Sequence, residues 1–154
     1  MSVHYFLHLS GSLFLKLQDI PLILEKIIIM KNIIHTENAP AAIGPYSQAV
    51  EANGMLFISG QVAINYETGK VVTGGITEQT EQVMKNIGAI LKEAGYGFRD
   101  VIKSTCLLSD MGNFAAMNAV YGKYYPENPP ARAAFAVKEL PLGVLVEIET
   151  IAVK

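Results

Sequence analysis

The sequence contains very little cysteine: Cys106 is the only one among its 154 residues. A single thiol excludes a disulfide within the chain and makes a reducing, cytoplasmic setting the simplest expectation. The three histidines are scattered, without the spacing of metal ligands. Neither a G-x-G-x-x-G segment nor a phosphate-binding loop is present. We therefore expect no metal and no organic cofactor.

Charge is also sparse. Lys and Arg total 12 against 14 for Asp and Glu, a net charge of −2, and no basic block occurs. A nucleic-acid partner is disfavoured, because such binding depends on a basic patch. Only 17% of residues are charged and 51% are hydrophobic, whereas about a quarter are charged in ordinary globular domains. The excess of apolar residues favours an oligomer.

Residues 1–29 differ in character from the rest. Residues 3–17 are largely apolar, but charged residues interrupt the remainder. The segment therefore lacks the roughly 20 consecutive apolar residues of a membrane-spanning helix, and it lacks the basic start of a secretory signal. We interpret residues 1–29 as a leader or non-native extension that ends before a natural start at Met30. A membrane-surface or partner-binding extension is the alternative. Residues 30–154 are expected to form one domain.

The pattern of apolar and turn residues predicts an α+β fold. Strands are expected over residues 47–52, 55–62, 101–108, 131–137 and 144–153, with a small hairpin around residues 67–70. Asn53-Gly54 should form the tight turn between the first two strands.

Two helices are expected between these strands. Thr77 is the expected N-cap of the first, and Gly95 should end it. Its apolar face comprises Val83, Ile87, Ile90, Leu91 and Ala94. Asp110 is the expected cap of the second helix, whose one-sided residues are Phe114, Met117, Tyr121 and Tyr124. We expect both helices to cover one face of the sheet.

Alternation in the last strand sorts its side chains onto two faces. One face carries Val144, Val146, Ile148 and Ala152; the other carries Leu145, Glu147, Glu149, Ile151 and Val153. Because both faces hold apolar residues, the face without helices should be buried against sister subunits. Glu147 and Glu149 are then expected near a surface between subunits.

Arg132 is the only charged residue in the apolar run of residues 129–137. Arginine keeps its proton in proteins, so a buried one requires an anion close by. Its planar fork of donors fits a carboxylate with two parallel hydrogen bonds. Two interpretations are open: a site for a small anion, or an internal ion pair with a glutamate of the last strand.

Several segments carry a family resemblance. Residues 36–49, TENAPAAIGPYSQA, resemble the opening signature of the RidA (YjgF/YER057c/UK114) family. Its later motifs are matched in order by residues 58–61 (ISGQ), 117–121 (MNAVY), 130–132 (PAR) and 147–153 (EIETIAV). The resemblance covers residues 30–154.

This resemblance implies a chorismate-mutase-like α+β fold, in which a mixed β-sheet is covered by two helices on one face. It also implies a homotrimer, a barrel-like assembly with sites between subunits. The implied activity is hydrolysis of reactive 2-imino acids, such as 2-iminopropanoate and 2-iminobutanoate, to 2-keto acids and ammonia, without metal or cofactor. Such imines arise from enamines released by pyridoxal-phosphate dehydratases, so the role is control of metabolite damage.

By the same resemblance, Arg132 binds the substrate carboxylate and Glu147 positions and activates water. Tyr46 would wall the pocket, Ser59 and Gly60 would line it with backbone, and Asn118 would donate hydrogen bonds. Glu149 is expected to be structural.

The chain departs from the family at two places. Many relatives carry a cysteine two residues after the motif arginine, where this chain has Ala134, so no thiol role is expected there. Residues 125–129 form a shorter segment than in some relatives, so the rim of the cleft is expected to differ. Cys106 is expected to be a small buried residue.

Two other functions stay open from the sequence. A non-catalytic trimer that binds small carboxylates as a regulator would use Arg132 equally well. An RNA-cleaving or translation-inhibiting protein is disfavoured by the acidic balance and by the lack of a basic stripe.

Overall fold

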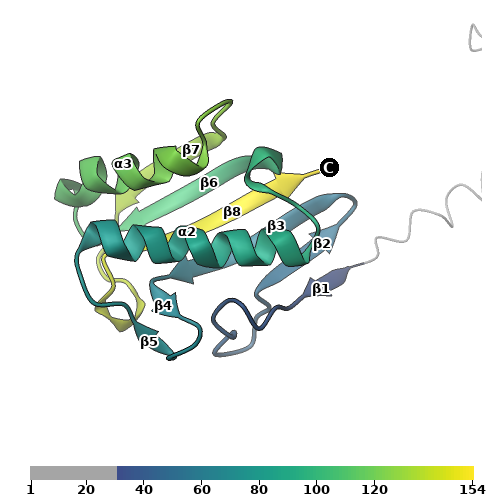
Figure 1. The fold of residues 1–154 in the computed structure, drawn as a ribbon, viewed down its shortest axis with the longest axis horizontal. Coiled ribbons are helices and arrows are strands. Elements are labelled where there is room, and N and C mark those ends of the chain that lie inside the picture. Colours follow the sequence, from purple (N-terminus) through teal and green to yellow (C-terminus); the bar gives the residue numbers. More distant parts are fainter. Residues whose placement is uncertain (1–30) are drawn as a thin grey trace, which may run out of the picture.

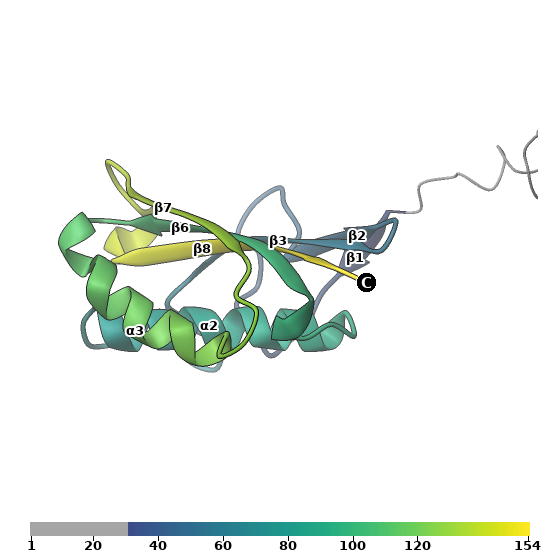
Figure 2. The ribbon, with the colours of Figure 1, turned by 90° about the horizontal axis from the view of Figure 1, so that it is seen from above.

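A computed structural model describes residues 31–154, which form a mixed β-sheet with two helices on one of its faces (Figures 1 and 2). The six-stranded sheet has the order β1-β2-β3-β8-β6-β7. Its neighbours are antiparallel except β6 and β7, which run parallel. The expected α+β class is confirmed. The interpretation of residues 1–29 lies outside the described residues.

The strands of this sheet are β1 (Asn32–Ile34), β2 (Ala49–Ala52), β3 (Met55–Val62), β6 (Val101–Leu108), β7 (Ala131–Ala136) and β8 (Val146–Val153). A separate small hairpin joins β4 (Ile64–Asn65) and β5 (Lys70–Val71). The helices are α2 (Ile76–Glu93) and α3 (Phe114–Tyr124). Short 3-10 turns occupy Phe98–Asp100, Met111–Asn113 and Pro141–Gly143.

The turn between β2 and β3 forms as expected. Asn53 and Gly54 have φ of 52° and 72°, and Ala52 pairs with Met55. Positive φ at both central residues is the geometry of the tight turn that matches the twist of a hairpin, and Asn-Gly is the sequence that adopts it most readily.

Helix α2 begins two residues earlier than the sequence predicted. Its N-cap is Gly75, whose N–H donates to Glu78 Oε2 at 2.8 Å, so the assignment of Thr77 as N-cap is wrong. The Glu78 side chain can reach back to one of the free N–H groups at the start of a helix. Its hydrogen bond therefore fixes the helix start at Gly75 rather than at Thr77. The end at Gly95, with φ of 78°, is confirmed.

Helix α3 follows a 3-10 turn that Asp110 caps by accepting a hydrogen bond from Gly112 N at 2.6 Å. Asp110 therefore caps the turn that leads into the helix. The buried residues of α3 are Met117, Val120 and Tyr121.

The hydrophobic core lies between the two helices and the sheet (Figure 2). Its fully buried side chains include Leu56, Val83, Met84, Ile87, Ile90, Leu91, Met117, Val146 and Ile148. Among the residues described, no helix is long and apolar enough to span a bilayer.

The opposite face of the sheet has no helix over it (Figure 2). In β8 the buried residues alternate with Glu147, Glu149, Ile151 and Val153, as expected. Residues of the neighbouring strands share this face with those of β8. Phe57 pairs with Ile151, and Leu107 pairs with both Glu147 and Phe135. Phe57 and Phe135 are 43% and 47% exposed, an unusual degree for large apolar side chains on a sheet.

Candidate functional site

Arg132 lies on β7, the edge strand beside α3. Its guanidinium carbon is 4.7 Å from the centroid of the Tyr121 ring and 5.6 Å from that of Phe114. Ion pairs within residues 31–154 join His35 to Glu37 and Arg99 to Asp100. Arg132 takes part in neither pair, so within this part of the chain its charge has no carboxylate partner.

Glu147 lies on β8, on the face without helices. A Cβ placed on Gly60 would overlap Glu147 Oε1 and would lie 2.9 Å from Glu147 Cδ. The carboxylate therefore lies directly against the backbone of β3, at the irregularity between Ile58 and Gln61. Only glycine leaves room for this approach.

The pKa of Glu147 is raised above the ordinary value of a glutamate. The main cause is burial, which disfavours the charged form, and the negative charge of Glu149 adds to it. Glu149 is exposed on the same face. A carboxyl group with a raised pKa, close to backbone and partly shielded from water, is suited to accept and return a proton.

Tyr46 lies in the loop before β2 and is 52% exposed. Its hydroxyl oxygen accepts a hydrogen bond from Ile43 N at 3.2 Å. Ile43 is itself 80% exposed, so the tip of this loop presents an aromatic and an aliphatic side chain outward. The role of Tyr46 as the wall of a pocket stays a prediction.

Gln48 anchors that loop and was not singled out from the sequence. Its amide, 3% exposed, donates to the carbonyls of Thr36, Ala39 and Pro40 at 3.0, 3.2 and 2.9 Å. Its oxygen accepts from Thr36 N at 2.7 Å. Gln48 is a polar residue within residues 36–49, the segment that resembles a family signature, and that position was the signal in the sequence. The hydrogen-bond partners of its side chain could not be predicted from the sequence.

The hydroxyl of Ser59 forms a hydrogen bond within the chain and is not free for a ligand. Its Oγ donates to Ser47 O at 2.7 Å, and its N–H donates to Gln48 O at 3.0 Å. These bonds attach the Tyr46 loop to β3 beside Gly60. That the backbone of Ser59 lines a cleft stays a prediction.

Asn118 lies on α3, one turn before Tyr121. Its Oδ1 is buried and has no hydrogen-bond partner in the described residues. The hydroxyls of Tyr121 and Tyr125 are in the same condition. Buried polar atoms are nearly always paired, so these three atoms are unused hydrogen-bonding capacity on α3 and just after it, the helix whose Tyr121 ring contacts Arg132.

The structure places the expected site residues in two groups. Glu147 and Gly60 are together on the face without helices, whereas Arg132 contacts the helix on the covered face. Strand β6 lies between β7 and β8. One chain therefore does not bring Arg132 and Glu147 together, and a site that uses both needs two chains.

Cys106 is fully buried, and burial raises the pKa of its thiol to about 11, although the nearby charge of Arg132 acts in the opposite direction. It pairs in register with Ala134 on β7. Cys106 is therefore unsuited to act as a nucleophile, since a protonated buried thiol is a poor one.

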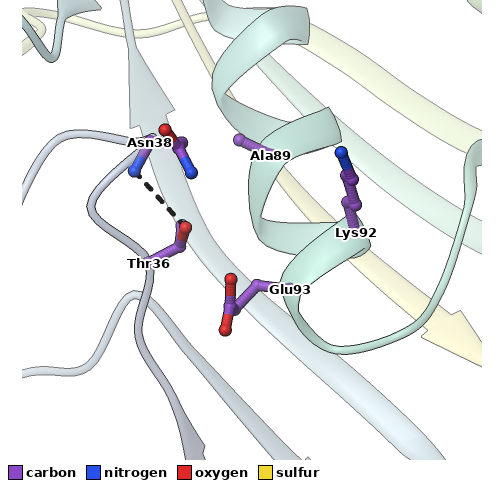
Figure 3. A pocket seen from close by; sticks show the side chains of 5 residues that line it. All are labelled: Thr36, Asn38, Ala89, Lys92 and Glu93. Carbon is purple, nitrogen blue, oxygen red and sulfur yellow. Dashed lines mark hydrogen bonds between the residues drawn. The ribbon is translucent and has the colours of Figure 1, made fainter.

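A pocket of about 420 Å³ opens elsewhere, between the segment after β1 and the end of α2 (Figure 3). Its lining consists of Thr36, Asn38, Ala89, Lys92 and Glu93. None of the residues expected at the site lines it.

Chemically, residues 31–154 offer a cation without a carboxylate partner among them and, on the other face of the sheet, a carboxyl group with a raised pKa. These groups can bind an organic acid and transfer a proton. They include no activated nucleophile.

A sequence model described as endoribonuclease L-PSP matches residues 36–154. A RutC family protein of Pyrococcus horikoshii is 56% identical over 125 residues, which cover 81% of this chain and 99% of the relative. A mouse protein named 2-iminobutanoate/2-iminopropanoate deaminase is 49% identical over 126 residues, 82% of this chain and 93% of its own. The crystal structure of Escherichia coli TdcF with bound serine superposes with a TM-score of 0.77 at 37% identity, over 80% of this chain and 98% of TdcF.

Proposed function

This chain belongs to the RidA family, and from that premise we propose that it hydrolyses reactive 2-imino acids, 2-iminopropanoate and 2-iminobutanoate, to 2-keto acids and ammonia. The mouse relative bears the name of this activity. Within the chain, the observation that carries the proposal is Arg132, a half-buried guanidinium without a carboxylate partner among residues 31–154.

Arg132 binds the carboxylate of the imino acid. Its guanidinium carbon lies over the rings of Tyr121 and Phe114. These contacts use none of its N–H groups in a hydrogen bond, so they stay available for two parallel hydrogen bonds to a carboxylate. A charge-assisted hydrogen bond contributes about 1.5–3 kcal/mol net. TdcF, a relative of the same fold, was crystallised with serine, which also carries a carboxylate.

Glu147 supports the addition of water to the imine carbon. As the water oxygen forms its bond to carbon, the Glu147 carboxylate accepts a proton from that water and the imine nitrogen gains a proton from solvent, which gives an amino alcohol. Glu147 then returns its proton to the nitrogen, the C–N bond breaks so that ammonia leaves, and the hydroxyl group releases its proton to solvent as the carbonyl forms. General acid–base assistance of this kind contributes about 10²- to 10⁴-fold. Asn118 and the backbone at Ser59 and Gly60 line the cleft, and Tyr46 walls it.

The site is shared between two chains of a cytoplasmic homotrimer. This arrangement is supported by the placement of Arg132 and Glu147 on different faces of the sheet and by the exposed Phe57 and Phe135 on the face without helices. Binding and proton transfer need neither a metal nor an organic cofactor.

A coupled assay tests the proposal. A pyridoxal-phosphate dehydratase acting on serine releases 2-aminoacrylate, and the added protein should accelerate the appearance of pyruvate. Arg132→Ala should remove the acceleration, and Arg132→Lys should weaken it strongly because an ammonium cannot form the paired hydrogen bonds. Arg99→Ala, at an exposed arginine, serves as the matched control and should behave as the unaltered protein.

Each failure of the assay has a different meaning. If pyruvate appears no faster with the protein while calorimetry shows Arg132-dependent binding of pyruvate, the chain is a carboxylate-binding regulator. The description endoribonuclease L-PSP raises the alternative of RNA cleavage. A nuclease signal that persists through purification and is lost in Arg132→Ala would support that alternative against ours.

A further inference from the structure

The guanidinium of Arg132 is held by an aromatic ring rather than by an acid. The centroid of Tyr121 lies 4.7 Å from its central carbon, and that of Phe114 lies at 5.6 Å. Both aromatic residues belong to α3, at its buried side and at its start. The contact therefore couples the edge strand β7 to the helix that covers it (Figure 1).

The choice of an aromatic partner has a chemical consequence. A carboxylate partner would occupy two N–H groups of the arginine and would compete with an anionic substrate for them. A ring attracts the cation through its face and leaves those N–H groups available. Stacking also restricts the side chain, which otherwise loses much conformational freedom when it binds a ligand.

Tyr121 is the rigid member of this contact. It is 5% exposed, and its ring is backed by Tyr125 at 4.6 Å between centroids. Tyr125 in turn meets the ring of Phe98 edge-on at 5.6 Å and 88°. The ring beneath the guanidinium is thus fixed by a second layer of aromatic side chains. Phe114, by contrast, is further away and half-buried.

The hydroxyl of Tyr121 adds nothing to the stack. It is buried and has no hydrogen-bond partner in the described residues. The face of the ring, and not its polar end, meets the cation. Phenylalanine at this position should therefore retain the contact, whereas an aliphatic side chain should lose it.

We propose that Tyr121 is the positioning residue that presents the Arg132 fork to the substrate carboxylate. The proposal rests on the proposed function, in which Arg132 binds that carboxylate. Tyr121 acts through Arg132 and does not itself contact the reacting atoms.

The test compares Tyr121→Phe with Tyr121→Leu in the pyruvate assay. Tyr121→Leu should raise KM about 2- to 30-fold, the range that corresponds to a cation–π contact, with kcat close to that of the unaltered protein, because the contact serves binding alone. Tyr121→Phe should keep the original KM. The same ordering is expected for the dissociation constants of pyruvate measured by calorimetry.

Two controls separate positioning from a structural role. Tyr124→Leu removes an aromatic side chain from the same helix, one that stacks on Phe98 at 5.0 Å, and should leave KM unchanged. In an Arg132→Ala background, Tyr121→Leu should have no further effect on pyruvate binding, because the group that it positions is gone. If Tyr121→Leu does not fold, Tyr121→Met gives the same comparison with a more adaptable side chain.

Failure of this inference is distinguishable from failure of the proposed function. If the unaltered protein accelerates pyruvate formation but Tyr121→Leu keeps its KM, the positioning role is wrong. The role is equally wrong if Tyr121→Phe loses as much as Tyr121→Leu, or if Tyr121→Leu weakens pyruvate binding further in the Arg132→Ala background. If the unaltered protein does not accelerate the reaction, the proposed function fails, and the calorimetric comparison still decides whether Tyr121 positions Arg132.

Discussion

At the scale of single residues, the environment of Glu147 decides its chemistry. Its pKa is raised mainly by burial and further by the charge of Glu149. A general base works best when its pKa approaches the working pH, because it is then both deprotonated and basic enough. In the proposed reaction the two neighbouring carboxylates on β8 therefore have separate roles: Glu147 transfers the proton, and Glu149 adjusts the pKa at which it does so.

This division of roles predicts a shift of the pH profile. Glu149→Gln removes the like charge, which lowers the pKa of Glu147 and keeps it deprotonated to lower pH. The acidic limb of kcat/KM should therefore move to lower pH. The measurement is the pyruvate assay across the acidic range, corrected for uncatalysed hydrolysis at each pH. An unchanged limb would show that Glu149 does not influence the proton-transferring group.

A second residue-scale prediction concerns the contact between Gly60 and Glu147. Gly60→Ala places a methyl group where the Glu147 carboxylate lies and pushes it aside. A displacement of about 1 Å at a catalytic group can cost on the order of 10²-fold in rate, so we expect a loss of that size in kcat. The fold should persist, because the side chain that must move is the flexible end of a glutamate.

The matched control for this change is Gly122→Ala in α3. A Cβ at Gly122 meets nothing within 4 Å, and alanine stabilises a helix interior by about 0.5–1 kcal/mol relative to glycine. Activity should stay at the original level and stability should rise slightly in urea unfolding. Full activity in Gly60→Ala would mean that Glu147 is not required where it lies.

At the scale of elements, the start of α2 depends on one carboxylate. Glu78 accepts the N–H of Gly75 at 2.8 Å, while Thr77, which has the chemistry of an N-cap, is exposed inside the first turn. Glu78→Ala should lower the free energy of unfolding by about 1 kcal/mol, the usual cost of losing a cap. Thr77→Ala should change it by less than about 0.5 kcal/mol. Urea unfolding of both variants checks this, and the reverse order would restore Thr77 as the cap.

The elements that could be predicted are those with long patterns or a defined turn. Strands β3 and β6 have the bounds that the apolar and turn residues predicted, and the Asn53-Gly54 turn fixed one hairpin. Strand β1 was missed, because three residues are too few to show a period. The start of α2 was misplaced because Thr77 is a residue type that is common at N-caps. The structure instead uses the side chain of Glu78, in the first turn, to accept the N–H of Gly75.

At the scale of the whole molecule, the pairing of strands, rather than the pattern of residues along each strand, decides which residues can form one site. Alternation placed Glu147 on the face without helices, and it could also sort the side chains of β7. It could not show that β6 separates β7 from β8, since strand order depends on contacts between distant segments. The resemblance named Arg132 and Glu147 as members of one site between subunits, and the structure shows that within one chain they lie on opposite faces of the sheet.

The last prediction follows from that separation. Arg132→Ala and Glu147→Gln should each be inactive alone, yet active when the two chains are co-expressed and assemble together. A site that takes Arg132 from one chain and Glu147 from its neighbour is intact in about a quarter of the interfaces of a randomly mixed oligomer. The pyruvate assay should thus recover about a quarter of the original activity. A chain carrying both substitutions, co-expressed with either single variant, should recover nothing. No recovery from the two single variants would mean that one chain supplies the whole site, against the arrangement of its sheet.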